Sequence, residues 1–184
     1  GYIFDQSNLK EKEDSLIVER NRLANIITGT NVGTWEWNVQ TNEVIFNEKC
    51  AQMIGYTLDE ISPTTINTWM KFIQPDDLEK SKQLLRSHFN KELDYYESEM
   101  RMKHKNGSWI WIEARGKVIS WNEKNEPIIM MGTHIDITKE KILIEEMEIV
   151  KNRFENMFKT HSSVMLLINP NNQKIIDANQ RPVH

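Results

Sequence analysis

Several residue types and patterns are scarce in this chain of 184 residues, and each shortage narrows what the protein can be. A single cysteine, Cys50, rules out an internal disulfide framework and is typical of a reducing compartment, so we expect a cytoplasmic location. No apolar run approaches the roughly 18 residues of a membrane span, and residues 1–5 lack the basic start of a signal peptide. The formal charge of −4 shows no basic surplus, so nucleic acid is not an expected partner.

Catalytic signatures are missing as well. The sequence holds no glycine-rich phosphate loop, no nucleophile–base triad and no paired catalytic carboxylates, so we expect no enzymatic activity from this chain. It has no starting methionine and ends abruptly at residues 181–184, which suggests a piece of a longer protein. A membrane anchor elsewhere in that parent protein stays open.

The sequence does contain a hydrophobic period that changes along the chain. Apolar residues recur with helical spacing over 7–27, where Leu9, Leu16 and Leu23 stand seven residues apart. Strands are expected at 35–39, 44–46, 95–104, 109–121 and 127–137, with short helices at 48–54, 58–61 and 66–73 and a longer one ending near 90. This order predicts an α+β fold, in which a five-stranded antiparallel sheet carries short helices on one face between N-terminal and C-terminal helices.

Residues that favour turns and caps mark the boundaries of these elements. Gly29 is predicted to end the first helix, and an acidic residue near Pro75 to cap the longer one. The pair Asn106-Gly107 predicts a hairpin with a type I′ turn, which needs positive φ.

A helical period returns after residue 139. Leu143, Met147, Val150 and Phe154 are spaced by four, three and four residues, which is typical of a coiled-coil seam. We therefore expect a homodimer through the flanking helices. Beyond residue 161 the sequence predicts a β-hairpin with apolar faces, which should pack on the preceding domain or on a neighbouring chain.

Five short segments carry a family resemblance. In chain order they are Gly33–Asn38, Met53–Glu60, Trp69 with Ile73–Asp77, Lys105–Trp111 and Gly132–Thr138. Together they resemble the motifs of the PAS family, in the form that is followed by a PAC motif. One position departs from the family pattern: Gln74 stands where a histidine is usual, although its amide can still bond the backbone.

The resemblance implies a domain order and a role. The parts are an N-terminal amphipathic helix (1–27), a PAS domain with its PAC motif (28–138), a coiled-coil-like connecting helix (139–160) and the truncated start of a second PAS domain (161–184). Such a module perceives a small ligand, redox or other cytoplasmic cue and relays it through the exit helix. The receiver would be an output domain of the same parent chain, such as a histidine kinase or a diguanylate cyclase. The alternative is a ligand-free PAS module that only dimerises and spaces its neighbours.

Two sets of residues are candidates for these tasks. Asp136, Ile137 and Thr138 stand where the resemblance places the signal relay, and the first and last of them can also cap the exit helix. A cavity is expected to be lined by Trp37, Met53, Met70, Met100, Met102, Met130 and His104, with Trp35 and Trp69 near it. Methionine walls suit an apolar ligand and plain packing equally well. No cofactor is required by the sequence.

Three histidines and the cysteine invite other interpretations. His104 and His134 could lie on adjacent strands and bind a metal, and His88 stands on the helix where haem-binding PAS domains carry their ligand. Ordinary packing explains His104 and His134 better, because no third ligand is suitably spaced. For His88, the neighbours Ser87 and Phe89 do not strengthen a haem role. Flavin photosensors of this superfamily carry a reactive cysteine on the later helix, and here that segment, 66–73, has none, which excludes flavin–cysteinyl photochemistry. Cys50 is expected to be a small buried residue.

Overall fold

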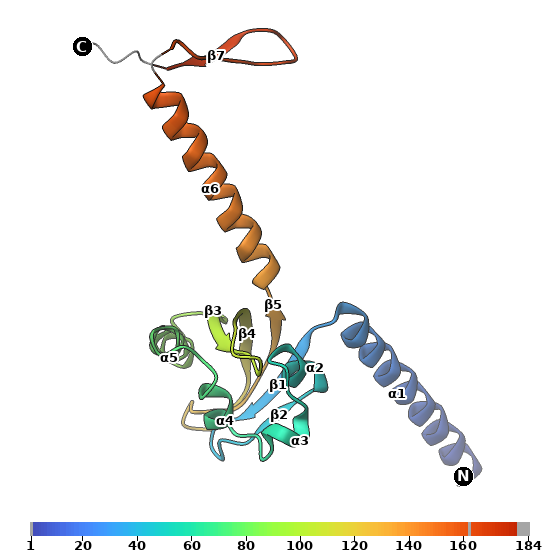
Figure 1. The fold of residues 1–184 in the computed structure, drawn as a ribbon. Helices are drawn as coiled ribbons and strands as arrows, with labels where there is room; N and C mark the ends of the chain where they lie inside the picture. The colour runs from blue at the N-terminus through green and yellow to red at the C-terminus, as the bar shows by residue number, and fades with distance from the viewer. Residues whose placement is uncertain (1, 162, 180–184) are drawn as a thin grey trace. The chain divides into compact units, whose positions relative to one another are not determined.

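The computed structural model describes residues 2–161 and 163–179, with side chains described from residue 8 onward. The chain forms two compact units, Gly1–Ile137 and Thr138–His184. In chain order (Figure 1) the elements are α1 (Tyr2–Thr30), β1 (Gly33–Asn38), β2 (Val44–Phe46), α2 (Glu48–Met53), α3 (Leu58–Ile61), α4 (Ile66–Met70), α5 (Pro75–Phe89), β3 (Tyr96–Lys103), β4 (Trp109–Trp121), β5 (Pro127–Asp136), α6 (Thr138–Thr160), β6 (Leu166–Ile168) and β7 (Ile175–Ala178).

The first unit is built on a five-stranded antiparallel sheet in the order β2-β1-β5-β4-β3. Strand β5, the last of these five in the sequence, lies in the middle between β1 and β4, so the first and last strands of this sheet are neighbours. This architecture confirms the predicted α+β class. It also places the end of β5 directly before the helix that leaves the domain.

One face of the sheet is buried because apolar residues alternate along every strand. Trp35 and Trp37 on β1, Ile112 on β4 and Met130 on β5 belong to one core cluster. Figure 1 shows the short helices α2 to α5 beside the sheet, and residues from these helices complete the cluster. The core therefore lies between the sheet and these helices.

The start of α5 is fixed to the edge strand β3. Gln74 caps the helix by accepting from the backbone N–H of Asp77, so the cap is this amide and not the acidic residue predicted. The buried carboxylate of Asp77 instead accepts from the backbone and guanidinium of Arg101 on β3, at 2.7 to 2.9 Å. These bonds to Arg101 hold the pKa of Asp77 below its usual value, so the carboxylate is charged at neutral pH.

Two details of the prediction were wrong: the residue that ends the first helix and the type of the turn between β3 and β4. Helix α1 continues through Gly29 to Thr30, and Asn31, at φ 56°, is the residue that adopts the left-handed conformation after it. At the β3–β4 hairpin only Gly107 has positive φ, so the turn is not type I′. The hairpin loop is longer than two residues, and its Lys105 N–H donates to the carbonyl of Ile54 in the turn after α2.

The second unit consists of α6 and the hairpin β6–β7. The apolar side chains Leu143, Met147, Val150 and Phe154 on α6 are 41% to 72% exposed, and every residue of β6 and β7 is exposed. The expected packing of this hairpin on a domain or a neighbouring chain therefore stays a prediction. None of the helices in the described part of the chain is long and apolar enough to span a membrane.

Candidate ligand-binding cavity

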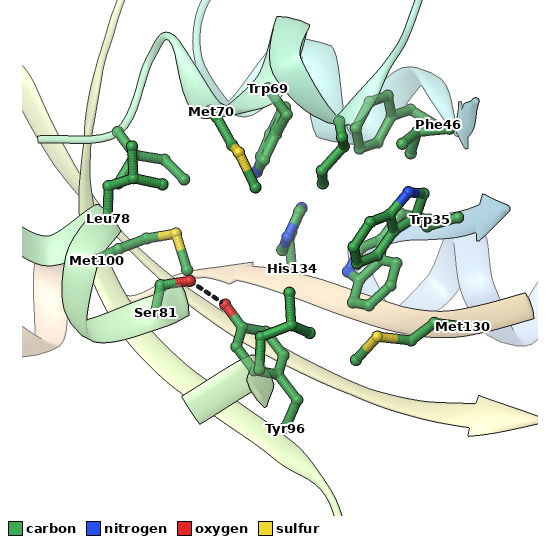
Figure 2. A pocket seen from close by; sticks show the side chains of 15 residues that line it. Trp35, Phe46, Trp69, Met70, Leu78, Ser81, Tyr96, Met100, Met130 and His134 are labelled. Carbon is green, nitrogen blue, oxygen red and sulfur yellow. Dashed lines mark hydrogen bonds between the residues drawn. The ribbon is translucent and has the colours of Figure 1, made fainter. Parts of the chain in front are cut away.

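A small cavity of about 60 Å³ lies inside the first unit, between the buried face of the sheet and helices α4 and α5. It is lined by Trp35, Trp37, Val44, Phe46, Ile66, Trp69, Met70, Ile73, Leu78, Ser81, Leu85, Tyr96, Met100, Met130 and His134. Figure 2 shows these side chains converging from strands and helices, with His134 in the middle of the group. The walls are largely aromatic and aliphatic, which is the usual character of a small-molecule site.

The structure brings together four of the seven residues predicted to line a cavity. Trp37, Met70, Met100 and Met130 line it, and so do Trp35 and Trp69. Met53 and Met102 are buried but lie in other parts of the core. His104 does not reach the cavity because it follows the end of β3 and packs against Gly55, where an added Cβ would lie 2.5 Å from its Nε2.

Trp35 is held flat against the sheet by two glycines. Gly116 on β4 and Gly132 on β5 face each other in the ladder. A Cβ at Gly116 would lie 2.4 Å from the Trp35 ring, and one at Gly132 would lie 2.3 Å from it. The glycine pair therefore makes the space that this indole occupies, and in doing so sets one wall of the cavity.

Three tryptophans that line the cavity have a buried indole N–H without an acceptor among the described residues. The Nε1 atoms of Trp35, Trp37 and Trp69 are buried and make no hydrogen bond within the described part of the chain. An indole N–H can only donate, and leaving a buried donor unpaired costs about 1 to 3 kcal/mol. Most buried polar groups in proteins are paired, so these three indole N–H groups are exceptions within the core.

His134 is the main polar group of the cavity wall. Its ring is buried and stacks on Trp69, with 4.7 Å between the ring centroids and 5° between the planes. Burial lowers the pKa of His134 to about 3, because the imidazolium would lose its hydration. The imidazole is therefore neutral at physiological pH.

Cys50 on α2 lies behind His134. Its sulfur is 3.8 Å from His134 Nδ1 and 3.4 Å from the carbonyl oxygen of Thr34. Burial raises the pKa of the Cys50 thiol to about 12, so the group is a protonated thiol and not a thiolate nucleophile. The two side chains are a neutral pair, as expected for a buried cysteine of the core.

A second polar spot lies across the cavity. The hydroxyls of Ser81 on α5 and Tyr96 on β3 are 2.6 Å apart and bond each other, as the dashed line in Figure 2 marks. Burial raises the pKa of Tyr96, which keeps its hydroxyl protonated. This pair ties α5 to the edge strand β3. Both hydroxyls are uncharged, and no lysine, arginine, aspartate or glutamate lines the cavity.

His88, the candidate haem ligand, has a structural task. Its Nδ1 is 2.8 Å from the carbonyl oxygen of Leu93, and its Nε2 accepts from the N–H of Val118 at 3.0 Å. A neutral imidazole has one donor and one acceptor nitrogen, so both are used. His88 therefore bridges the end of α5 to β4 and has no lone pair left for iron.

The suggested pairing of His104 with His134 was wrong. Strand β3 is an edge strand that pairs only with β4, whereas His134 lies on central β5, so the two histidines are not on adjacent strands. No group of three or more histidine, cysteine, aspartate or glutamate side chains suited to a metal gathers among residues 2–161 and 163–179.

The predicted relay residues lie at the exit of the sheet. Asp136 is the last residue of β5, and Thr138 begins α6. Between them, the N–H of Ile137 donates to the carbonyl oxygen of Trp111 on β4 at 2.9 Å, so the sheet is bonded up to this point. His134 is only two residues earlier on the same strand.

Sequence reasoning missed the polar members of the cavity, above all His134, Ser81 and Tyr96. A usable signal was present for the first of them. Side chains alternate along a strand, and Met130, which was named, lies four residues before His134 and faces the same side. No sequence pattern signals the Ser81–Tyr96 contact, because its partners are 15 residues apart on different elements.

The fold and the cavity together define a class: a domain with a five-stranded antiparallel sheet, a largely apolar cavity between sheet and helices, and a helix that follows its central strand. The model of the PAS fold matches residues 43–134, half of the chain, and the chain belongs to this family. A PAS domain is typically a non-catalytic module within sensor kinases.

Individual proteins support the same class. A sensory box histidine kinase/response regulator from Burkholderia thailandensis is 27% identical, with a TM-score of 0.63, over 73% of this chain and 98% of that one. The N-terminal domain of a diguanylate cyclase with a PAS/PAC sensor from Marinobacter aquaeolei shares the fold, at 20% identity and a TM-score of 0.52, over 60% of this chain and 98% of that one.

A longer protein matches in sequence. Hybrid signal transduction histidine kinase A of Dictyostelium discoideum is 32% identical over 131 residues, which cover 65% of this chain. The match spans only 6% of that protein's length. Together these relatives identify the chain's PAS domain as a sensor domain of signalling proteins.

Proposed function

We propose that this chain senses a small molecule in the cavity and relays its presence through the end of β5 to α6. The observation that carries the proposal is the position of His134. This side chain lines the cavity, and its strand ends two residues later at Asp136, immediately before the exit helix. A molecule that contacts His134 therefore acts on the strand that leads out of the domain.

The hydrogen bonding of β5 supports such a relay. The strand is paired on both sides, with β1 and with β4, so a shift at its centre moves along a bonded sheet and does not end in local fraying. Asp136, Ile137 and Thr138 would carry the shift into α6. The protonated state of Cys50, the only cysteine in the sequence, favours a ligand over thiol oxidation as the cue.

The test combines ligand detection with a readout at the helix. The purified chain should carry a small adduct in native mass spectrometry that is released on denaturation. Removing the adduct should change amide hydrogen exchange at residues 137–141. A Trp109→Phe variant is the control for a substitution outside the cavity and should keep the adduct, because this residue does not line the cavity and is 46% exposed. An empty cavity, or a released ligand with unchanged exchange at the helix start, would contradict the proposal.

The alternative function, a ligand-free dimerisation and spacer module, is favoured by the exposed seam on α6. Leu143, Met147, Val150 and Phe154 form an apolar stripe with coiled-coil spacing, and these side chains are exposed among the described residues. We propose that a second copy of the chain pairs along this seam. Both functions need the dimer, so the oligomeric state does not distinguish them. Detection of a bound small molecule by native mass spectrometry does.

A double substitution tests the seam. Leu143→Lys with Val150→Lys should convert the dimer to a monomer in light scattering, because two buried lysines per chain would face each other. The matched control is Ile142→Lys with Ile149→Lys, which has the same spacing and added charge but lies off the seam and should remain dimeric. A wild-type monomer, or equal effects of both pairs, would rule out this interface.

A further inference from the structure

We infer that the cavity selects its ligand through the lone pair of His134 Nε2: the occupant is a small uncharged molecule that donates an N–H or O–H group to this atom. The inference rests on the proposed function and specifies the chemistry of its ligand. His134 is 4% exposed and lines the cavity, and its Nε2 makes no hydrogen bond within the described part of the chain. Figure 2 shows the ring extending from its strand among the lining side chains, with a nitrogen at its far end.

The Nε2 atom of His134 can be reached from the cavity, in contrast to the indole nitrogens. Among the described residues, the unpaired side-chain nitrogens that are fully closed off are those of the three tryptophans, and His134 Nε2 is not one of them. Stacking on Trp69 covers a face of the imidazole, with only 5° between the planes, and leaves its edge open. Because the lone pair lies in the ring plane, a ligand can meet it at this edge.

The surroundings of the other ring nitrogen make Nε2 the acceptor. A neutral imidazole carries one proton, on Nδ1 or on Nε2. The Cys50 sulfur is 3.4 Å from the carbonyl oxygen of Thr34 and 3.8 Å from His134 Nδ1, so the thiol proton points to the carbonyl, which can only accept. Nδ1 then faces the lone pairs of the sulfur and carries the ring proton, since two lone pairs would repel each other. Nε2 is left unprotonated.

A donor on the ligand is required because no side chain of the wall supplies one to Nε2. The hydroxyls of Ser81 and Tyr96 already bond each other. The indole N–H groups are closed off and make no hydrogen bond among the described residues. A molecule that can only accept would place its own lone pair against that of His134, so it is disfavoured.

The ligand is uncharged because the cavity offers no countercharge. Its lining contains no lysine, arginine, aspartate or glutamate. Burial holds the pKa of His134 at about 3 and raises the pKa of Tyr96, so both side chains are neutral at pH 7. An ammonium group would be a donor as well, but moving an ion into such surroundings without a partner is strongly unfavourable.

The ligand is also small. A cavity holds one water for about 10 to 15 Å³ of this kind of volume, so about 60 Å³ accommodates roughly four or five non-hydrogen atoms. The methionines of the wall, Met70, Met100 and Met130, can adjust to the shape of such a molecule. A small alcohol or a five-membered ring with one N–H group has this size.

The experiment compares two probes of nearly the same shape on the full chain. Pyrrole carries an N–H donor, and furan replaces that group with an oxygen atom that can only accept. Side-chain ¹⁵N signals of ¹⁵N-histidine-labelled protein, assigned through correlations to the backbone, report which ring nitrogen carries the proton. The free chain should show His134 protonated on Nδ1. Pyrrole should shift the His134 Nε2 signal saturably, leave exposed His161 unmoved, and bind about tenfold more tightly than furan, the effect of one hydrogen bond.

Two variants test the acceptor and what orients it. His134→Phe keeps an aromatic ring but removes the acceptor, so the preference for pyrrole over furan should disappear, whereas His161→Phe should keep it. Cys50 does not line the cavity, and Cys50→Ala should also reduce the preference, because Nδ1 loses the sulfur and the proton is no longer held there. The ratio of the two affinities is the readout, since a change in cavity volume affects both probes alike.

The outcomes separate this inference from the proposed function. A ring proton on Nε2 in the free chain, or furan binding as tightly as pyrrole, would overturn the inference, while a native adduct would leave the proposed function standing. If neither probe binds, the inference fails, and the absence of any native adduct would then overturn the proposed function separately. Both of the deciding measurements use the wild-type chain, so they do not depend on whether the His134→Phe variant folds.

Discussion

Replacing Gly132 with alanine should destabilise the PAS domain by about 3 kcal/mol or more, because the added methyl group meets atoms that cannot move aside. Its Cβ would lie 2.2 Å from the carbonyl oxygen of Arg115 and 2.3 Å from the Trp35 ring. The Arg115 carbonyl belongs to the inner strand β4, whose ladder with β5 would have to open. Urea denaturation followed by far-UV circular dichroism measures the loss.

Two controls separate the causes of this effect. Gly29→Ala, at a helical site with nothing within 4 Å, should be neutral or slightly stabilising. Gly116→Ala meets mainly the Trp35 ring, since its nearest backbone atom is at 3.0 Å. Adding Trp35→Leu should therefore recover part of the stability of Gly116→Ala but not of Gly132→Ala. Near wild-type stability of Gly132→Ala would show that this account of the Trp35 wall is wrong.

Replacing His88 with alanine should cost about 3 to 5 kcal/mol of unfolding free energy, from a lost side-chain volume and broken hydrogen bonds. The imidazole is only 4% exposed and bonds both the Leu93 carbonyl and the Val118 N–H. Without it, the N–H of Val118 on β4 is left without this acceptor, and α5 loses its tie to the sheet. Thermal and urea unfolding of the purified variant provide the measurement.

The matched control is His161→Ala, because this histidine is exposed and its side chain accepts from the backbone N–H of Ser163, two residues away, while its longer-range bond from Asn179 uses the backbone carbonyl that alanine keeps. It should change stability by no more than about 0.5 kcal/mol. The same pair of variants separates the structural role of His88 from the haem role. A haem ligand would be needed for a visible absorption band and not for the apoprotein's stability, so an unaltered unfolding curve for His88→Ala would contradict the bridge.

Local patterns accounted for most of the fold. Alternation predicted the strands around Met100 and Met130, because side-chain direction in a strand depends only on the parity of position. The glycine of the β3–β4 hairpin was placed correctly, but its turn type was not. That turn depends on how the loop meets the turn after α2, where Lys105 bonds Ile54, and this contact spans about fifty residues.

The cavity was less predictable than the sheet around it. Trp37, Met70, Met100 and Met130 were assigned to it because large apolar residues on the inner face must meet somewhere in one core. His104 was misplaced for the same reason: it continues the phase of β3, but the strand has ended and the side chain meets Gly55 instead. The alternation along a strand indicates which face of the sheet a residue points to, but it does not indicate where the strand ends.

The sequence by itself predicted a sheet of five antiparallel strands and a seam of apolar residues on the exit helix, because these features depend on spacing along the chain, which one sequence records. The PAS family was recognised in a different way, from five motifs that resemble those of the family. Only the tertiary structure decided that Gly132 makes room for Trp35, that His88 is a bridge, and that His134 lines a cavity without a charged side chain. Those properties arise where strands and helices distant in sequence meet, and the distances between them follow from packing.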